Sequence, residues 1–260
     1  MLLAIDVGNT NLVCGLYDGR NLLCRWRLET SPRKSADEYG IALKQMFETD
    51  GYSFSQVEDV ILSTVVPSLT FTIQHLCEKY FGKTPIVVGP GVKTGLVVKY
   101  DNPKQLGADR IVNSVAAIEK YPAPVIVMDF GTATTICAVS DNAEFLGGVI
   151  APGMKISSEA PVEKTAKLPR IELEKPRHVI CRNTNECMQS GLIYGHIGMV
   201  EYLVAKMKEE IKVLTGCDKK VTVVATGGMS YLIADNTDCI DYIDRDLTLT
   251  GLELIYEKNK

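Results

Sequence analysis

Two short acidic segments repeat along this chain, and they carry the side chains best suited to chemistry. Each runs from an apolar strand through an aspartate, an apolar residue, a glycine and small polar residues into a second apolar strand. Asp6 of the first segment aligns with Asp129 of the second, and Gly8 aligns with Gly131, without a gap. A repeat of this period suggests two related domains and not a solenoid.

The turn after the first aspartate has the composition of a phosphate-binding loop. Its glycine allows close backbone approach, because no Cβ stands in the way. Asn9, Thr10 and Asn11 offer amide N–H groups and side-chain donors to phosphate oxygens. Asp6 would be repelled by phosphate, so we expect it to hold Mg²⁺, directly or through water, since Mg²⁺ prefers oxygen ligands. A single turn of this kind also fits a plain hairpin, but two copies at strand ends favour a phosphate site.

The second acidic turn would form the other side of the same site. Asp129, Gly131 and Thr132 would face the first turn across a cleft, with the nucleotide phosphates between them. Phosphoryl transfer needs mostly positioning and charge neutralisation. Two donor turns and a metal ion would supply most of what such a reaction requires.

A Gly-Gly turn offers a candidate nucleoside site. An apolar run at 223–226 leads into Gly227 and Gly228, and a helical pattern follows. Bare backbone there would let a flat ring lie against it. Such a turn is often only structural, but its place after the two phosphate turns favours adenosine binding.

Asp109 and Arg110 stand side by side at the start of a helical apolar pattern. An acidic residue there can simply stabilise the helix N-terminus, by about 0.3–1 kcal/mol. A kinase also needs a base within hydrogen-bond reach of the attacking hydroxyl, and an aspartate often fills that role. Arg110 could hold a carboxylate or phosphate with its guanidinium fork.

The elements expected to position these residues follow a repeated order. Predicted strands are residues 2–7, 12–17, 22–29, 60–65, 85–88, 125–129, 134–139, 144–150 and 221–226. Predicted helices run from Ser35 to about Thr49 with Ser35 and Glu38 at capping-box spacing, over 68–80, from Asp109, and over 185–215, 230–236 and 249–257.

Three antiparallel strands followed by alternating helix and strand fit a ribonuclease H-like unit. The predicted fold class is therefore α/β, with two ribonuclease H-like (actin-like ATPase) domains, mixed sheets and a central nucleotide cleft. We expect domains at residues 1–118 and 119–260. The chain length allows this, since 260 residues accommodate two domains of about 120–130 residues.

Composition narrows the function classes. The net charge is −4 and no basic face is clustered, so a nucleic-acid partner is not expected. No apolar stretch approaches the roughly 18–20 residues that span a bilayer, and the N-terminus has no signal-peptide pattern. We expect a soluble, cytoplasmic protein with no membrane partner, whose eight cysteines are reduced and buried.

Taken together, the motifs closely resemble those of the type III pantothenate kinases, in the acetate and sugar kinase, chaperone and actin superfamily. The matching stretches are Asp6-Val-Gly-Asn-Thr-Asn11, Ala36-Asp-Glu-Tyr39, Ser63-Thr-Val-Val-Pro67, Gly89-Pro-Gly91, Lys93-Thr-Gly95, Tyr100-Asp-Asn-Pro103, Gly107-Ala-Asp-Arg110, Asp129-Phe-Gly-Thr-Ala-Thr-Thr135, Gly147-Gly148, Ala151-Pro-Gly153 and Thr226-Gly-Gly228. The likeness covers essentially the full length. The chain departs from the common pattern at Cys137 and at Pro161-Val162, which lie outside the expected catalytic set.

The resemblance implies an activity and a set of residue roles. Such enzymes transfer the γ-phosphoryl group of ATP to the primary hydroxyl of pantothenate, the first step of coenzyme A synthesis. The implied ATP contacts are Asp6, Val7, Gly8, Asn9, Thr10, Asn11, Leu12, Val13 and Thr132, beside the adenosine turn at Gly227 and Gly228. The implied pantothenate contacts are Tyr100, Gly107, Ala108, Asp109, Arg110 and Thr184.

Within that set the resemblance assigns particular tasks. Asp109 would be the base that accepts the hydroxyl proton, and Asp129 would bind a monovalent cation, K⁺ or NH₄⁺. Thr184 would reach pantothenate across a homodimer interface. The implied cofactors are Mg²⁺ with ATP and the monovalent cation.

Two other functions remain open from the sequence. The first is a non-catalytic regulator of the same fold, resembling the Bvg accessory factor group. The second is a phosphohydrolase that releases phosphate without an organic acceptor. The presence of Asp6, Asp109 and Asp129 together argues against the regulator, which would not need all three.

Overall fold

The computed structural model describes all 260 residues and contains two compact units built from interleaved segments. The first unit comprises Met1–Gly95, Asn102–Ala116 and Asp246–Lys260, and the second comprises Leu96–Asp101 and Ala117–Arg245. The predicted division at residue 118 remains a prediction. The compact units differ from it because the C-terminal segment belongs with the first unit and a short segment before residue 102 belongs with the second.

The sheet of the first unit has five strands in the order β3-β2-β1-β4-β5. Their bounds are Leu2–Val7 (β1), Asn11–Asp18 (β2), Asn21–Glu29 (β3), Asp59–Thr64 (β4) and Ile86–Val87 (β5). Strand β1 pairs antiparallel with β2 and parallel with β4, so the sheet is mixed. Strand β1 is apolar and almost wholly buried up to Asp6, as expected for a central strand covered on both faces.

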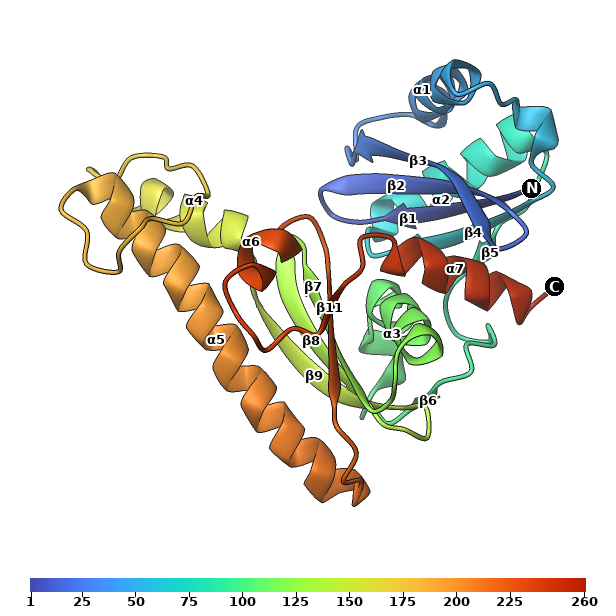
Figure 1. The fold of residues 1–260 in the computed structure, drawn as a ribbon. Helices are drawn as coiled ribbons and strands as arrows, with labels where there is room; N and C mark the ends of the chain where they lie inside the picture. Colours follow the sequence, from blue (N-terminus) through green and yellow to red (C-terminus); the bar gives the residue numbers. More distant parts are fainter. The chain divides into compact units, whose positions relative to one another are not determined.

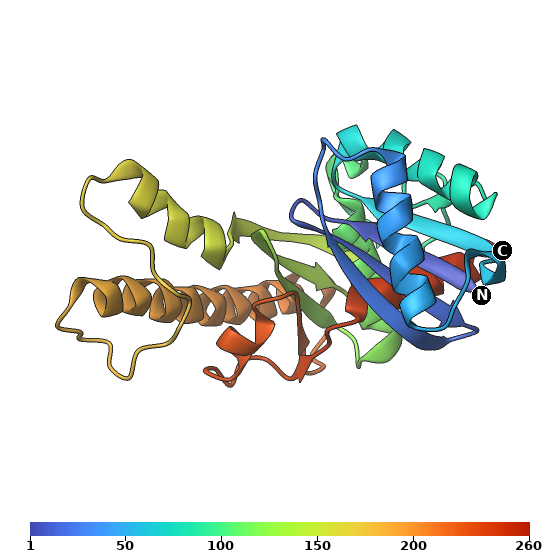
Figure 2. The ribbon, with the colours of Figure 1, turned by 90° about the horizontal axis from the view of Figure 1, so that it is seen from above.

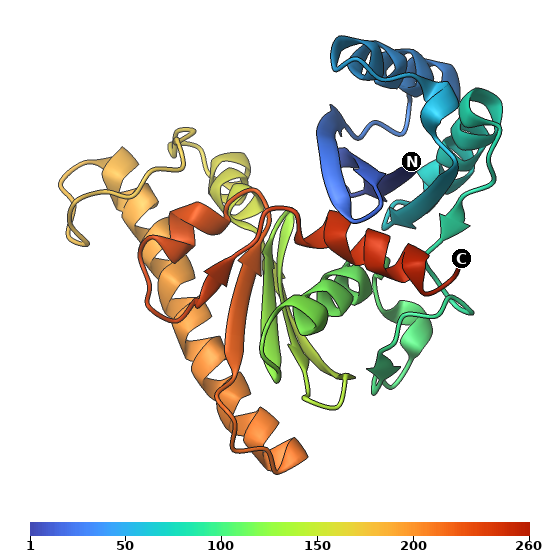
Figure 3. The ribbon, with the colours of Figure 1, turned by 45° about the vertical axis from the view of Figure 1, so that its right-hand side comes forward.

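Helices cover both faces of this sheet (Figures 1 and 3). They are α1 (Ala36–Thr49), α2 (Pro67–Leu76) and α7 (Leu247–Glu257). Leu3, Ile5 and Val7 face a core shared with α1 and α2. Helix α7 lies on the opposite face, where Gly15 leaves room for Leu249. Helix α3 (Ala108–Lys120) begins in this unit and ends in the second.

The sheet of the second unit has six strands in the order β11-β10-β7-β8-β9-β6. Their bounds are Val97–Val98 (β6), Val125–Phe130 (β7), Ala133–Val139 (β8), Glu144–Pro152 (β9), Thr222–Thr226 (β10) and Tyr242–Ile243 (β11). Its helices are α4 (Met154–Lys164), α5 (Thr184–Thr215) and α6 (Ser230–Ala234). Helix α5 runs the length of the unit beside α4 and the sheet (Figure 2) and buries Ile193, Ile197 and Val200 against β7. Even this helix is not apolar enough over its length to cross a membrane, and neither is any other.

The two sheets repeat one another strand for strand. The order β3-β2-β1-β4-β5 corresponds to β9-β8-β7-β10-β11, with β6 added at the edge. Strands β1 and β7 have the same burial pattern, and so do β2 and β8 over seven residues. Even the irregularity between the second and third strands recurs, at Leu16/Tyr17 and at Ala138/Val139. The predicted duplication, and with it the predicted α/β fold class with mixed sheets, is confirmed.

The register corrects the gapless alignment of the two turns. Asp6 pairs with Val13, whereas Asp129 pairs with Thr135, so the second turn is one residue shorter. The Gly8 amide donates to the Asn11 carbonyl, while the Gly131 amide donates to the Ala133 carbonyl. The residues on both sides of the two turns are similar in type, so the sequence comparison did not reveal that the second turn lacks one residue.

Most predicted elements are present, including the Ser35–Glu38 capping box of α1. The two-residue strands β6 and β11 were not predicted, because two residues show no periodicity. The helix predicted over 68–80 is α2 followed by a π-helical turn at Cys77–Phe81. All eight cysteines are free, but the expectation that all are buried is wrong, because Cys187 is exposed.

Candidate active site

The first acidic turn follows directly from the end of β1. Asp6 is half-buried at the edge of the core, and Asn9 and Thr10 are exposed in the two-residue loop beyond Gly8. A Cβ on Gly8 would lie 3.1 Å from the Asn11 carbonyl oxygen, which is tighter than ordinary contact. The glycine therefore keeps this turn narrow and leaves its exposed tip accessible to a ligand.

Asp109 lies in the first turn of α3, as predicted, and its environment is specific. Its Oδ1 accepts a hydrogen bond from the Arg110 amide at 2.8 Å. Burial raises the pKa of the Asp109 carboxyl above its ordinary value of 3.8, and the neighbouring Arg110 amide and charge only partly oppose this. A carboxylate with a raised pKa is a better proton acceptor than an exposed aspartate.

Gly107 makes this placement of Asp109 possible. A Cβ on Gly107 would lie 2.5 Å from Asp109 Oδ1, so any larger residue would displace the carboxylate. The same position lies 3.8 Å from Cγ1 of Val65. Val65 in turn donates its amide to the carbonyl of Val7 at 3.0 Å, next to the acidic turn. Within the first unit, Val65 therefore lies close both to the candidate phosphate turn and to Gly107, which adjoins the candidate base.

Arg110 is 5% exposed, which is unusual for an arginine. Its backbone is fixed in α3, since its carbonyl accepts the Ser114 hydroxyl at 2.7 Å. A buried guanidinium next to Asp109 could bind an anionic group of the substrate. The desolvation cost of binding would be small, because folding has already removed this guanidinium from water. Ala108 supplies the first residue of the helix between Gly107 and Asp109.

The second acidic turn is tightly packed by glycines from two other elements. Strands β7 and β10 are parallel, with Asp129 in register with Thr226. Gly227 follows at φ +91°, and a Cβ there would lie 2.5 Å from Asp129 Oδ1. A Cβ on Gly153, at the end of β9, would collide with carbonyl oxygens of Gly131 and Thr132. The structure therefore brings Asp129, Thr132 and Gly227 together within the second unit.

Gly228 differs from its neighbour, because it is exposed and nothing lies near the position of a Cβ. Beyond it the Met229 amide donates to the Phe130 carbonyl at 3.3 Å, which ties the start of α6 to β7. The turn thus presents bare backbone beside Asp129, and its role as a nucleoside site stays a prediction.

Tyr100 and Thr184, both expected at pantothenate, lie at opposite ends of the second unit. Tyr100 follows β6 and packs edge-to-face on Phe145 at the start of β9, with ring centroids 6.1 Å apart. Thr184 begins α5, whose first turns lie beside α4 after the other end of β9 (Figures 1 and 2). Strand β9 has nine residues, so its ends are roughly 25 Å apart. One chain does not bring these two residues together.

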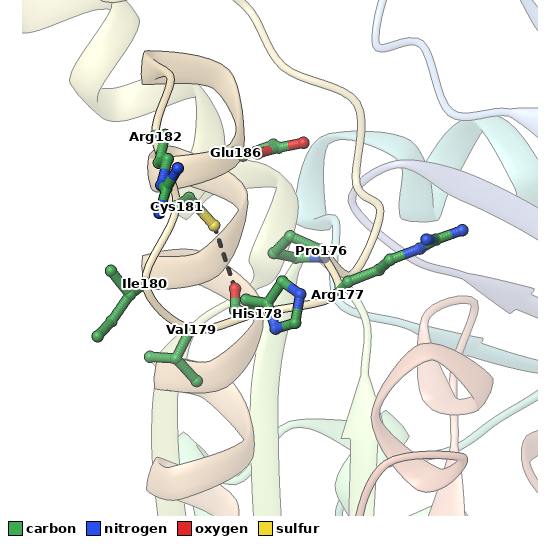
Figure 4. A pocket seen from close by; sticks show the side chains of 8 residues that line it. All are labelled: Pro176, Arg177, His178, Val179, Ile180, Cys181, Arg182 and Glu186. Carbon is green, nitrogen blue, oxygen red and sulfur yellow. Dashed lines mark hydrogen bonds between the residues drawn. The ribbon is translucent and has the colours of Figure 1, made fainter.

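The segment before Thr184 forms an exposed pocket (Figure 4). In it the Cys181 thiol donates to the His178 carbonyl at 3.1 Å, and the Arg177 side chain points away. Val179 and Ile180 are 63% and 88% exposed there. The lining residues are Pro176, Arg177, His178, Val179, Ile180, Cys181, Arg182 and Glu186. These two side chains expose apolar surface a few residues before Thr184.

The acidic residues fit the ions that a nucleotide would bring. Mg²⁺ in nucleotide sites is commonly held by one or two carboxylates together with substrate phosphates and water, which Asp6 can satisfy. Asp129 has one carboxylate oxygen lined by the backbone of Gly131 and Gly227, where side chains would fill the space. No cluster of three or more side-chain metal ligands is present in the structure.

Comparison with solved structures identifies the fold. A protein assigned to the Baf family of transcriptional activators, from Campylobacter jejuni, matches with a TM-score of 0.62 at 19% identity, covering 99% of this chain and 98% of that chain. The ROK hexokinase of Thermus thermophilus matches with a TM-score of 0.50 at 13% identity, covering 100% and 99%. Component A of (R)-2-hydroxyglutaryl-CoA dehydratase from Acidaminococcus fermentans matches with a TM-score of 0.52 at 12% identity, again covering 100% and 99%. At these identities the likeness shows the sugar kinase and actin-like ATPase fold.

Comparison with protein families is more specific. A sequence profile described as type III pantothenate kinase matches residues 2–206. This match spans most of the chain and includes both acidic turns, together with the Asp109–Arg110 pair that the first unit holds beside one of them. The chain therefore belongs to the type III pantothenate kinase family.

Proposed function

We propose that this protein transfers the γ-phosphoryl group of ATP to the primary hydroxyl of pantothenate. Family membership supports a pantothenate kinase, and one structural observation carries the assignment of its chemistry. That observation is Asp109, a carboxyl with a raised pKa, held by Gly107 next to Val65 and so next to the first acidic turn.

In this proposal the first turn binds the phosphates of ATP. Residues Asp6–Val13 would contact them, chiefly through the exposed N–H groups and side chains of Asn9 and Thr10. Asp6 would hold Mg²⁺, which when bound neutralises phosphate charge. Thr132, Gly227 and Gly228 would contact the nucleotide from the second unit.

Asp109 would act as the general base. The pantothenate hydroxyl gives its proton to the Asp109 carboxylate while its oxygen forms a bond to the γ-phosphorus. The bond between that phosphorus and the oxygen bridging to ADP breaks, and ADP leaves with the electron pair. Arg110 would hold the pantothenate carboxylate, so that the hydroxyl at the other end of the molecule is oriented.

The proposal also includes a monovalent cation at the second acidic turn. Asp129 would hold K⁺ or NH₄⁺ at the carboxylate oxygen lined by Gly131 and Gly227. A monovalent cation there would add positive charge near the phosphates without the strict geometry that Mg²⁺ demands. We also expect the enzyme to be cytoplasmic.

A homodimer would explain the position of Thr184. Because Thr184 lies at the far end of its own unit from Tyr100, a second copy could supply it to the pantothenate site. The exposed Val179 and Ile180 beside it, and Val213 and Leu214 on α5, offer apolar surface for such contact. Light scattering at assay concentration tests this, and a monomer with full activity would contradict it.

A coupled assay with ATP and pantothenate tests the function directly. We expect ADP release that depends on pantothenate, on Mg²⁺ and on K⁺ or NH₄⁺, with little activity when Na⁺ is the only monovalent cation. ATP binding without turnover would indicate a non-catalytic regulator instead, and ADP release without pantothenate would indicate a phosphohydrolase. Full activity in Na⁺ alone would remove the cation role of Asp129 but leave the kinase assignment intact.

A further inference from the structure

Thr30, the residue directly after β3, forms hydrogen bonds with the first acidic turn from the β3 side. Its hydroxyl donates to the Gly8 carbonyl at 2.7 Å, and its amide donates to the Thr10 carbonyl at 3.0 Å. These two carbonyls flank Asn9, at the exposed tip of the turn. Thr30 is therefore tied to both sides of the residue that would lie closest to a phosphate.

The chain around Thr30 is itself held by a buried tyrosine. Tyr39 of α1 is 1% exposed. Its hydroxyl oxygen accepts the Ser31 amide at 2.8 Å and lies 3.4 Å from the Glu29 carbonyl, a hydrogen-bond acceptor. The residues on both sides of Thr30 are thus anchored to the core, so Thr30 is a fixed support for the turn.

This support determines which polar groups of the turn point outward. A carbonyl oxygen carries partial negative charge and would repel a phosphate, whereas an amide N–H attracts it. The hydrogen bonds from Thr30 hold the Gly8 and Thr10 carbonyls on the β3 side. Reorienting either carbonyl would rotate the adjoining peptide planes, including the amides of Asn9 and Asn11.

The second acidic turn shows that the hydroxyl is a feature of the first turn alone. By strand pairing Thr30 corresponds to Gly153, since Glu29 pairs with Asn11 and Pro152 pairs with Ala133. The Gly153 amide donates to the Thr132 carbonyl at 3.2 Å, which repeats the amide bond of Thr30. A side chain at 153 would collide with that same carbonyl. The two-residue tip of the first turn leaves room for the hydroxyl, and the shorter second turn does not.

We propose that Thr30 is a positioning residue, which orients the amides of the first acidic turn toward ATP by holding the Gly8 and Thr10 carbonyls away from it. This inference rests on the proposed function, in which that turn binds the ATP phosphates. Thr30 itself would not touch the nucleotide.

The test compares Thr30→Val, which keeps the shape and the amide but removes the hydroxyl, with Thr30→Ser, which keeps the hydroxyl. In Thr30→Val we expect the Kd and KM for ATP to rise roughly three- to tenfold, the range for losing one hydrogen bond. The KM for pantothenate and the melting temperature should change little, and Thr30→Ser should restore ATP affinity to within about twofold of wild type. Thr49→Val is the matched control, because it removes an exposed hydroxyl bonded to the Gln45 carbonyl in the same unit.

Unchanged ATP affinity in Thr30→Val would overturn the proposal. An equal rise in KM for both substrates without rescue by Thr30→Ser would also overturn it, since that pattern indicates general loss of structure. Direct measurement of ATP binding separates this inference from the proposed function. If wild type binds ATP but does not phosphorylate pantothenate, the acceptor assignment fails while the comparison of the Thr30 variants still decides the positioning role.

Discussion

Asp109 differs from an ordinary surface aspartate in a way that suits a base. Burial raises the pKa of its carboxyl, while the Arg110 amide keeps one oxygen oriented. The balance matters, because a carboxyl with too low a pKa would be a poor proton acceptor and an unsupported buried one would remain protonated. Gly107 permits this arrangement, because a Cβ there would lie 2.5 Å from Asp109 Oδ1 and would displace the carboxylate.

Replacing Asp109 with Asn should lower kcat by roughly 10²-fold or more, the usual scale for a positioned base. ATP affinity should change little, because the residue acts on the acceptor. Steady-state kinetics and ATP titration measure both quantities. Asp37→Asn is the control, since Asp37 pairs with Lys79 in an exposed bridge and should leave turnover unaffected. Near-normal kcat in the Asp109 variant would remove this residue from the mechanism.

At the scale of elements, the same hairpin motif occurs once in each of the two sheets. Both hairpins place an aspartate at the end of a buried central strand, and each third strand is followed directly by a residue whose amide donates to the turn. They differ by one residue in turn length. The longer first turn exposes a two-residue tip, whereas the shorter second turn is packed by Gly153 and Gly227. This difference is consistent with phosphate binding at the first turn and cation binding at the second.

Substitution of Gly8 tests the narrow first turn. In Gly8→Val the branched side chain would press on the Asn11 carbonyl, only 3.1 Å from a Cβ, and occupy space that the phosphates need. We expect the affinity for ATP to fall by about 10²-fold or more. This is the order of the loss that a 1 Å misplacement in an active site can cause. Isothermal titration with ATP provides the measurement.

Gly19→Ala serves as the control for that experiment. Gly19 has φ +55° in the turn between β2 and β3, so alanine there strains a hairpin of the same sheet away from the acidic turn. It should lower stability and leave ATP affinity unchanged. Equal ATP affinity in Gly8→Val and wild type would show that the first turn is only structural.

At the scale of the whole molecule, each unit is assembled from distant parts of the chain. Helix α7 is held in the first unit by an ion pair between Arg25 and Asp246. Two hydrogen bonds add to it, one between Thr248 and Asn113 and one of 2.5 Å between Tyr256 and Asp59. Gly251 of α7 approaches α3 so closely that a Cβ would collide with the Val112 carbonyl. The C-terminal helix is therefore part of the unit that holds Asp109.

Glu253 of α7 is expected to make the stability of the protein depend on pH. It is 3% exposed, and burial raises the pKa of its carboxyl above the ordinary value of 4.5. The folded state therefore holds this proton more tightly than the unfolded state. Stability is greatest while the group is protonated and falls as pH rises from about 4.5 through the higher pKa of the folded protein.

Glu253→Gln removes the buried charge and should stabilise the protein at pH 7 by roughly 0.5–2 kcal/mol, the usual gain from correcting one local defect. The gain should shrink as the pH falls toward 4.5, because this carboxyl then becomes increasingly protonated in folded wild type. Urea unfolding at both pH values measures the free energy of unfolding. Glu48→Gln, in an exposed pair with Lys44, should show no comparable gain. A variant that is less stable than wild type at pH 7 would show that the charged carboxylate is needed.

The sequence was sufficient for the features that depend on neighbouring residues. Strands, caps and turns follow from local periodicity and turn chemistry, so the acidic hairpins, the α1 capping box and the start of α3 at Asp109 could be predicted. The duplication was also visible, because its two copies keep the same residue types at the same spacing. These features are the basis for the candidate site residues that the proposed variants test.

Tertiary structure alone decided what depends on close approach between distant residues. The contacts of Gly227 with Asp129, of Gly107 with Val65 and of Thr30 with the first turn join positions 20 to 98 residues apart. The strand pairing was needed to show that the second turn is one residue shorter than the first. The helix packing was likewise needed to show that α7 belongs to the first unit. Such contacts depend on distances of a few ångströms that the whole fold determines. They cannot be predicted from residue types and their spacing in the sequence.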